Sequence, residues 1–192
     1  MYKRQGVTMS MKEPLKLGLI LGVIALVISV MLAFANEMTA GIIEKRQQDD
    51  TQAALRQVLS AQTYEKTEKP ASAGSDVDDV YIAKNGGDVL GYCVKVGPNG
   101  YGGEISMIVG VEKDGSVSGV SITEMNETPG LGTHAKEDKF INQYPAFKAP
   151  YKVSKDGGEI QAISGATITS RAVTNGVNQA VETVKLLGGG AK

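Results

Sequence analysis

Residues 164–170 (SGATITS) have the side chains that could hold a phosphate group. Four hydroxyls, a glycine and an alanine stand directly before an amphipathic helical pattern. A helix N-terminus presents unpaired N–H groups and a partial positive charge, and therefore favours an anion. The same hydroxyls could instead cap the first turn of the helix, which is their commoner use. The segment predicts either a phosphate-binding site or a plain helix cap.

Residues 127–133 (ETPGLGT) have the backbone features of a loop that approaches a flat ligand. Pro129-Gly130 favours a tight turn, and two glycines let backbone amides come close to a ring or its carbonyl oxygens. An ordinary loop between a strand and a helix is the alternative. The run 130–135 also matches the dinucleotide pattern G-x-G-x-x-A, but no βαβ unit brackets it. A nicotinamide-binding fold is therefore disfavoured.

Both segments resemble the FMN-binding domains of two membrane complexes, namely the G subunit of the Rnf electron-transport complex and the C subunit of the sodium-translocating NADH:quinone reductase. SGATITS resembles their flavinylation motif, and ETPGLG resembles a segment that lines the flavin. Residues 100–103 (GYGG) and the two strands predicted after them resemble the core of these domains. The resemblance extends over roughly residues 80–185, and the N-terminal anchor matches the Rnf layout.

The resemblance implies that Thr167 is joined to the phosphate of FMN as a phosphoester, attached by a separate flavin transferase that uses FAD as donor. It also implies a set of flavin-binding residues around this threonine: Ser164, Gly165, Ala166, Ile168, Glu127, Thr128, Gly130, Leu131, Gly132 and Thr133. The family often has an aspartate three residues before the first Ser or Thr of the motif, where this chain has Gln161.

The implied function is that of a membrane-anchored electron-transfer protein without catalytic activity of its own. It would relay electrons in an Rnf-type complex that couples ferredoxin and NAD redox chemistry to Na⁺ or H⁺ movement, with the other membrane subunits as partners. The compact chain favours Rnf over the longer protein of the quinone reductase. Two alternatives remain: an anchored binding or assembly module without a cofactor, and a secreted flavin reductase.

The composition excludes several other classes of function. One cysteine, Cys93, and one histidine, His134, cannot form a Cys-rich zinc or iron–sulfur site within this chain alone. A net charge of −1 gives no electrostatic basis for binding nucleic acid. Cys93 is expected to be a small buried hydrophobe. His134 is expected to be a solvated loop residue, with modulation of the flavin as the alternative.

Residues 17–35 form an uncharged apolar run of 19 positions, enough to cross the roughly 30 Å hydrocarbon layer of a membrane as a helix. Before it stand one acid, Glu13, and four cationic residues, Lys3, Arg4, Lys12 and Lys16. Cationic flanks stay in the cytoplasm, so the rest of the chain is expected on the periplasmic or extracellular side. An A-x-A pattern at 33–35 would suit signal-peptide cleavage, but the run exceeds the usual h-region. A retained anchor in membrane lipid is therefore predicted.

The remaining pattern predicts an α+β domain, with helices on one face of a small antiparallel sheet. A helix is expected over 36–64 and a loop over 65–79, followed by strands at 80–83, 89–96, 105–111 and 117–122. Two further helices are expected, at 137–144 and 172–187. The predicted organisation is a cytoplasmic N-terminus (1–16), a transmembrane helix (17–35), a helix and linker (36–79), an FMN-binding domain (80–187) and a tail (188–192).

Overall fold

The computed structural model describes residues 12–188, which divide after Gln48 into two units. The predicted cytoplasmic N-terminus (1–16) and C-terminal tail (188–192) lie mostly outside the described residues, as do Lys3 and Arg4 of the cationic flank. Predictions about these ends therefore stay predictions.

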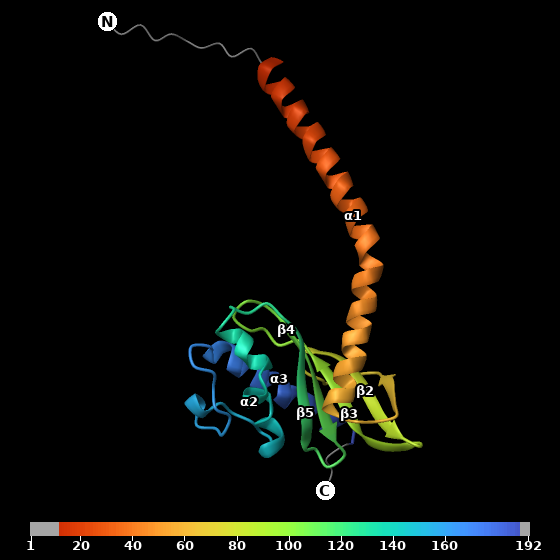
Figure 1. The fold of residues 1–192 in the computed structure, drawn as a ribbon, viewed down its shortest axis with the longest axis vertical. Coiled ribbons are helices and arrows are strands. Elements are labelled where there is room, and N and C mark those ends of the chain that lie inside the picture. Colours follow the sequence, from red (N-terminus) through yellow and green to blue (C-terminus); the bar gives the residue numbers. More distant parts are fainter. Residues whose placement is uncertain (1–11, 189–192) are drawn as a thin grey trace, which may run out of the picture. The chain divides into compact units, whose positions relative to one another are not determined.

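Helix α1 (Lys12–Val58) provides the described part of the first unit (Figure 1). The predicted span 17–35 lies within it as continuous helix, and all of its side chains are exposed. A helix that is apolar all round is stable where it is surrounded by an apolar medium. The chain thus has a helix long and apolar enough to cross a membrane, as the sequence predicts.

The second unit is built on a five-stranded antiparallel sheet in the order β1-β2-β3-β4-β5. Its strands are β1 (Thr63–Thr67), β2 (Val77–Asn85), β3 (Asp88–Val96), β4 (Ile105–Glu112) and β5 (Val117–Met125). Each strand pairs with the next along the chain, so the predicted meander is confirmed. Asparagine and glycine residues occupy the tight turn at 85–87 between β2 and β3, where the sequence predicts a hairpin.

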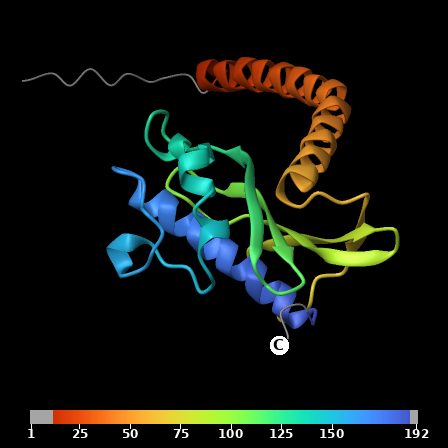
Figure 2. The same cartoon turned by 60° about the horizontal axis from the view of Figure 1, so that its bottom comes forward.

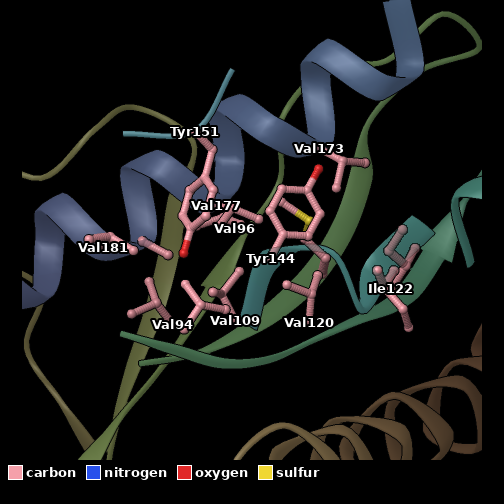
Figure 3. Packing of buried hydrophobic residues seen from close by; sticks show 14 of the residues in the cluster. Val94, Val96, Val109, Val120, Ile122, Tyr144, Tyr151, Val173, Val177 and Val181 are labelled. Carbon is pink, nitrogen blue, oxygen red and sulfur yellow. The ribbon is translucent and has the colours of Figure 1, made fainter. Parts of the chain in front are cut away.

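The main core lies between the sheet and α3 (Thr167–Leu186), which crosses one face of the sheet (Figure 2). Four mutually paired valines form a buried row across the strands: Val80, Val94, Val109 and Val120. Val173, Val177 and Val181 of α3 pack against this face at successive helical turns (Figure 3). This interlocked core fixes the position of the first turn of α3, which carries Thr167.

The second face of the sheet is also covered by a helix, whereas the sequence predicts helices on one face. Ala54, Leu55 and Val58, in the last turns of α1, form a separate cluster with the buried side chains Ala83, Cys93 and Ile108. The Ser118 Oγ donates to the Val58 carbonyl at 2.6 Å and so caps this helix end. Alternating residues of β3 and β4 therefore meet different helices on the two faces.

The chain between the helix and the sheet also differs from prediction. The expected helix over 36–64 ends at Val58, and the expected loop over 65–79 contains part of β1 and the start of β2. The Tyr64 hydroxyl donates to the Leu59 carbonyl at 2.7 Å and accepts from the Ala61 amide at 3.0 Å, which closes a turn in place of further helix. The strand β1 was missed because TYEKT lacks an apolar alternation, as suits a polar edge strand.

Short helical turns connect β5 to α3: η1 (Gly132–Lys136), α2 (Asp138–Ile141), η2 (Tyr144–Ala146) and η3 (Ser154–Asp156). The helix expected over 137–144 is thus shorter than predicted. Pro145 has no amide hydrogen to continue the α-helical ladder, and the chain tightens into a 3₁₀ turn there. Tyr144 then enters the core, where its ring packs edge-on against Tyr151 with centroids 5.4 Å apart (Figure 3).

Candidate functional site

Three segments far apart in the sequence meet at one hollow of about 530 Å³. Strand register explains part of this meeting, because Ile105 pairs with Met125 and the loops before β4 and after β5 leave the sheet side by side. The first turn of α3 completes the wall. Ten residues line the hollow: Tyr101, Glu127, Thr128, Leu131, Gly132, Gly165, Ala166, Thr167, Ile168 and Thr169. Its volume is within the range of small-molecule sites, which is about 300–1,000 Å³.

The carboxylate of Glu127 joins the three segments. It is buried, with 7% of the residue exposed. Its Oε1 accepts hydrogen bonds from the amides of Tyr101 (2.7 Å) and Gly102 (3.3 Å), and its Oε2 accepts from the Thr169 hydroxyl at 3.0 Å. These donors satisfy a buried charge that would otherwise be costly. Glu127 therefore holds the loop before β4 against the start of α3.

Glycine at two positions permits this close packing. A Cβ on Gly102 would collide with the carbonyl oxygen of Asn126, which is backbone and cannot rotate away. A Cβ on Gly132 would lie 2.5 Å from the Glu127 Oε2. Both positions are closed to side chains by direct overlap, so this wall of the hollow is shaped by backbone.

The four hydroxyls of residues 164–170 have different environments. Thr169 is 1% exposed and donates to Glu127; Ser170 is fully buried, accepts from the Ile163 amide and donates to the Ala166 carbonyl. Ser164 is exposed and Thr167 is half-buried. Two hydroxyls are thus buried in internal hydrogen bonds, and the other two belong to residues that are exposed or half-buried.

No side chain caps α3. Its N-cap residue is Ala166, and no side-chain capping hydrogen bond is made there. The plain helix cap, one of the two interpretations of this segment, is therefore wrong for the geometry of the turn. The N–H groups of the first helical turn have no partner within the helix.

Lys155 contacts the half-buried Thr167 and was not expected from the sequence. Its Nζ donates to the Thr167 Oγ1 at 2.9 Å. The neighbouring Asp156 forms a two-point ion pair with Arg171, with Nε–Oδ2 and Nη2–Oδ1 distances of 2.7 and 2.6 Å. The hydrogen bond from Arg171 lowers the pKa of Asp156, and the same bond raises the pKa of Arg171.

A second hollow of about 620 Å³ lies next to the first, at residues 127–133 and 164–170. Two of the predicted site residues, Gly130 and Ser164, line this hollow and are next in sequence to Leu131 and Gly165 of the first. Gln161, which stands where the family often has aspartate, also lines it. The Gln161 amide donates to the Gln143 Oε1 at 2.6 Å, and the Gln143 Nε2 donates to the Gln161 carbonyl at 3.3 Å.

The structure thus brings most of the predicted site residues to two adjoining hollows. Eight of the eleven line the first hollow, and Gly130 and Ser164 line the second. Thr133 closes the turn instead, because its Oγ1 accepts from the Gly130 amide at 3.0 Å. Tyr101 belongs to the GYGG stretch, which resembles the core of these domains, and it lines the first hollow with 71% of the residue exposed.

The single cysteine and histidine have the environments that the sequence favours. Cys93 is fully buried, and burial raises the pKa of its thiol to about 12. His134 is exposed in the second hollow, and its Nδ1 lies 2.6 Å from the Glu137 Oε1. The hydrogen bond to Glu137 raises the pKa of His134. Cys93 is structural, and His134 is solvated as expected, although it lies in the short helix η1 and not in a loop.

Comparison with known proteins identifies the family. Residues 100–182 match the model of the FMN-binding domain, and residues 9–58 match that of the RnfG N-terminal region. The G subunit of the Na(+)-translocating ferredoxin:NAD(+) oxidoreductase complex of Acetobacterium woodii is 39% identical over 95% of this chain and 97% of its own length. The chain belongs to the RnfG family. All three segments of the first hollow lie within the FMN-binding domain of the family.

Two other G subunits and one solved structure match over different shares of the chain. The G subunit of the ion-translocating oxidoreductase complex of Cereibacter sphaeroides is 35% identical over 87% of this chain and 82% of its own length. The G subunit of the proton-translocating ferredoxin:NAD(+) oxidoreductase complex of Clostridium ljungdahlii is 47% identical over 58% and 63%, respectively. A solved structure of the C subunit of Na(+)-translocating NADH-quinone reductase from Parabacteroides distasonis is 26% identical, with a TM-score of 0.44, over 55% of this chain and 62% of that one.

Proposed function

We propose that this chain is a membrane-anchored electron-transfer protein that carries FMN linked through its phosphate to Thr167. The observation that carries the proposal is the environment of the Thr167 hydroxyl, which lies at the start of α3 and has the Lys155 Nζ at 2.9 Å. A phosphodiester at this hydroxyl would meet a cation and the positive end of a helix. Thr169 and Ser170 are less suitable acceptors because their hydroxyls are buried in internal hydrogen bonds.

The rim of the first hollow suits a flat aromatic ligand. Among the large apolar side chains of residues 49–188, four are exposed, and three of them line this hollow: Tyr101 (71%), Leu131 (44%) and Ile168 (52%). Clustered exposed apolar side chains often mark a binding site. An isoalloxazine ring could cover them, while its polar edge could meet backbone amides of the glycine-rich loops.

The chain's own residues would bind and orient the cofactor, and the bound FMN would supply the redox chemistry in one- or two-electron steps. Glu127 would fix the two loops that flank the ring, and Thr167 would prevent loss of the flavin. No general acid–base pair is needed for electron relay. The proposed partners are the other subunits of an ion-translocating ferredoxin:NAD oxidoreductase complex, as named for the relatives.

Maturation and topology complete the proposal. A flavin transferase would attach the FMN half of FAD to Thr167. The second unit would lie on the periplasmic or extracellular side, because the cationic residues before the span favour a cytoplasmic N-terminus. A tether is useful there, since a flavin that dissociates outside the cytoplasm is not readily replaced.

The test is in-gel fluorescence and intact mass of the denatured full chain, made in cells that contain an active flavin transferase. Wild-type protein should fluoresce and carry the mass of FMN less one water, and Thr167→Ala should lose both. Ser164→Ala is the matched control, because it removes the hydroxyl of the exposed residue in the same turn, and it should stay labelled. Unlabelled wild-type protein would favour the cofactor-free binding module. Label that persists in Thr167→Ala would place the attachment elsewhere.

A further inference from the structure

We propose that Lys155 binds the phosphoryl group attached at Thr167, and that the Asp156–Arg171 ion pair positions it to do so. This inference rests on the proposed function, because it takes Thr167 as the attachment point. It assigns a role to η3, which lies outside the three segments that line the first hollow.

Two adjacent residues of η3 contact two residues of α3 that lie one helical turn apart. Thr167 and Arg171 are separated by four positions on α3 and therefore lie on the same face of the helix. Lys155 contacts the first at 2.9 Å, and Asp156 contacts the second at 2.6 and 2.7 Å. The two-point ion pair, which is half-exposed, thus helps to orient η3 along the helix where Lys155 reaches Thr167.

The backbone of η3 is itself well anchored. Val153 and Ile160 flank the turn, and each is 1% exposed. The Ser154 amide donates to the Ile160 carbonyl at 2.7 Å, and the Ile160 amide donates to the Lys152 carbonyl at 3.1 Å. The two ends of the turn are therefore anchored in the core, and this restrains the backbone from which Lys155 projects.

The charge balance of attachment explains why a cation is useful at this point. In the reaction, the Thr167 Oγ1 forms a bond to the phosphorus of the FMN half of FAD. The bond from that phosphorus to the pyrophosphate bridging oxygen breaks, and AMP leaves. The hydroxyl proton passes to a base of the transferase or to water. Negative charge grows on the phosphoryl oxygens, and the product keeps one negative charge. The Lys155 ammonium, with three N–H donors, can turn from Oγ1 to those oxygens without moving the backbone.

The experiment measures the rate of attachment to the full chain, purified in detergent and incubated with limiting flavin transferase and FAD. Lys155→Gln should slow attachment roughly 3- to 10-fold, the size expected for one partly exposed charge-assisted contact. Lys155→Arg keeps the charge and should restore most of the rate. Lys185→Gln is the control: it removes the same charge on α3 about 27 Å along the helix axis from Thr167.

A second measurement is made on the attached product and not on the rate of attachment. The ³¹P resonance of the attached phosphodiester at neutral pH should move in Lys155→Gln and stay in place in Lys185→Gln. The role of Arg171 is tested by a double-mutant cycle: Arg171→Gln should slow attachment in the wild-type chain and add no further loss in the Lys155→Gln chain. A merely structural role for Arg171 would give a further loss in both backgrounds.

The outcomes separate this inference from the proposed function. If wild-type protein is not labelled at Thr167, the proposed function fails. If wild-type protein is labelled and Lys155→Gln reacts at the wild-type rate, or gives an unchanged ³¹P resonance, the role of Lys155 is overturned. Because Lys155 is exposed, its replacement should leave the melting temperature unchanged, and circular dichroism of each variant checks that the chain is folded.

Discussion

The Glu127 Oε2 accepts a hydrogen bond from the Thr169 hydroxyl at 3.0 Å, across 42 residues of sequence. Both residues are buried, and the second carboxylate oxygen of Glu127 holds two amides of the loop before β4. This contact is why the family's loop and helix segments form one wall, and not two independent surface features. It also makes Glu127 a structural residue of the site, in addition to a predicted lining residue.

Removing either partner of this contact should destabilise the second unit. Thr169→Val keeps the shape of the side chain but leaves the Oε2 of a buried carboxylate without its donor, and Glu127→Gln weakens charge-assisted bonds to the two amides. Each change should lower the free energy of unfolding by about 1–3 kcal/mol. Urea unfolding of the full chain, followed by tyrosine fluorescence, measures this.

The same pair should be coupled. In the double variant Glu127→Gln/Thr169→Val, the loss should be smaller than the sum of the single losses, because the contact can be removed only once. Ser121→Ala is a matched control, since its hydroxyl donates to the exposed Gln57 side chain at 2.9 Å on the opposite face. Strict additivity of Glu127→Gln and Thr169→Val would contradict the shared hydrogen bond.

Tyr144→Phe should cost about 1 kcal/mol of unfolding free energy. The Tyr144 hydroxyl lies 2.9 Å from the Thr174 Oγ1, which itself donates to the Ser170 carbonyl at 2.8 Å, so Tyr144 is the donor in this pair. The change leaves a buried acceptor unpaired. Tyr151→Phe is the control, because its hydroxyl makes only a long, part-buried bond of 3.3 Å to the Phe147 carbonyl. An equal or larger loss for Tyr151→Phe would contradict this account.

The meander and α3 could be predicted from sequence because apolar residues alternate along the strands and repeat along the helix. The polar edge strand β1 was missed, as was the packing of helices on both faces of the sheet. TYEKT has no buried face of its own, and the contribution of Ala54, Leu55 and Val58 to the second cluster depends on residues of β2–β4. Edge strands and face assignments are set by distant partners, which local periodicity does not report.

For the hollow, the sequence predicted two of the three segments that line it, but not the contacts among them. Four hydroxyls of residues 164–170 look alike in sequence, and only helix geometry turns Thr169 toward Glu127 and Ser170 into the core. Lys155 lies twelve residues before Thr167 in a turn of ordinary composition (KDGG). Its contact arises because η3 packs beside the helix, and no local pattern encodes that.

Cys93 should be unreactive in the folded protein. Thiol alkylation requires the thiolate, and burial both raises the pKa of this thiol to about 12 and blocks access to it. Iodoacetamide at pH 8 should therefore leave the native full chain unlabelled and add one label in urea, as measured by intact mass. Ser164→Cys places a second thiol at an exposed position and should give one label in the native state and two in urea. Rapid labelling of the native wild-type chain would show that the second cluster opens readily.

His134 should titrate above its ordinary pKa of 6.5, because Glu137 accepts a hydrogen bond from its ring and stabilises the charged form. A raised pKa in the folded state means that the pair's contribution to stability is fully present below the unfolded pKa and is lost as the pH rises through the folded pKa. The contribution is small, since both groups are exposed. NMR titration can follow this directly, because the chain has a single histidine. In Glu137→Gln the pKa should fall toward 6.5, whereas Lys139→Gln, which removes a charge at the same hollow, should not lower it. A wild-type value at or below 6.5 would show that the ion pair does not persist in solution.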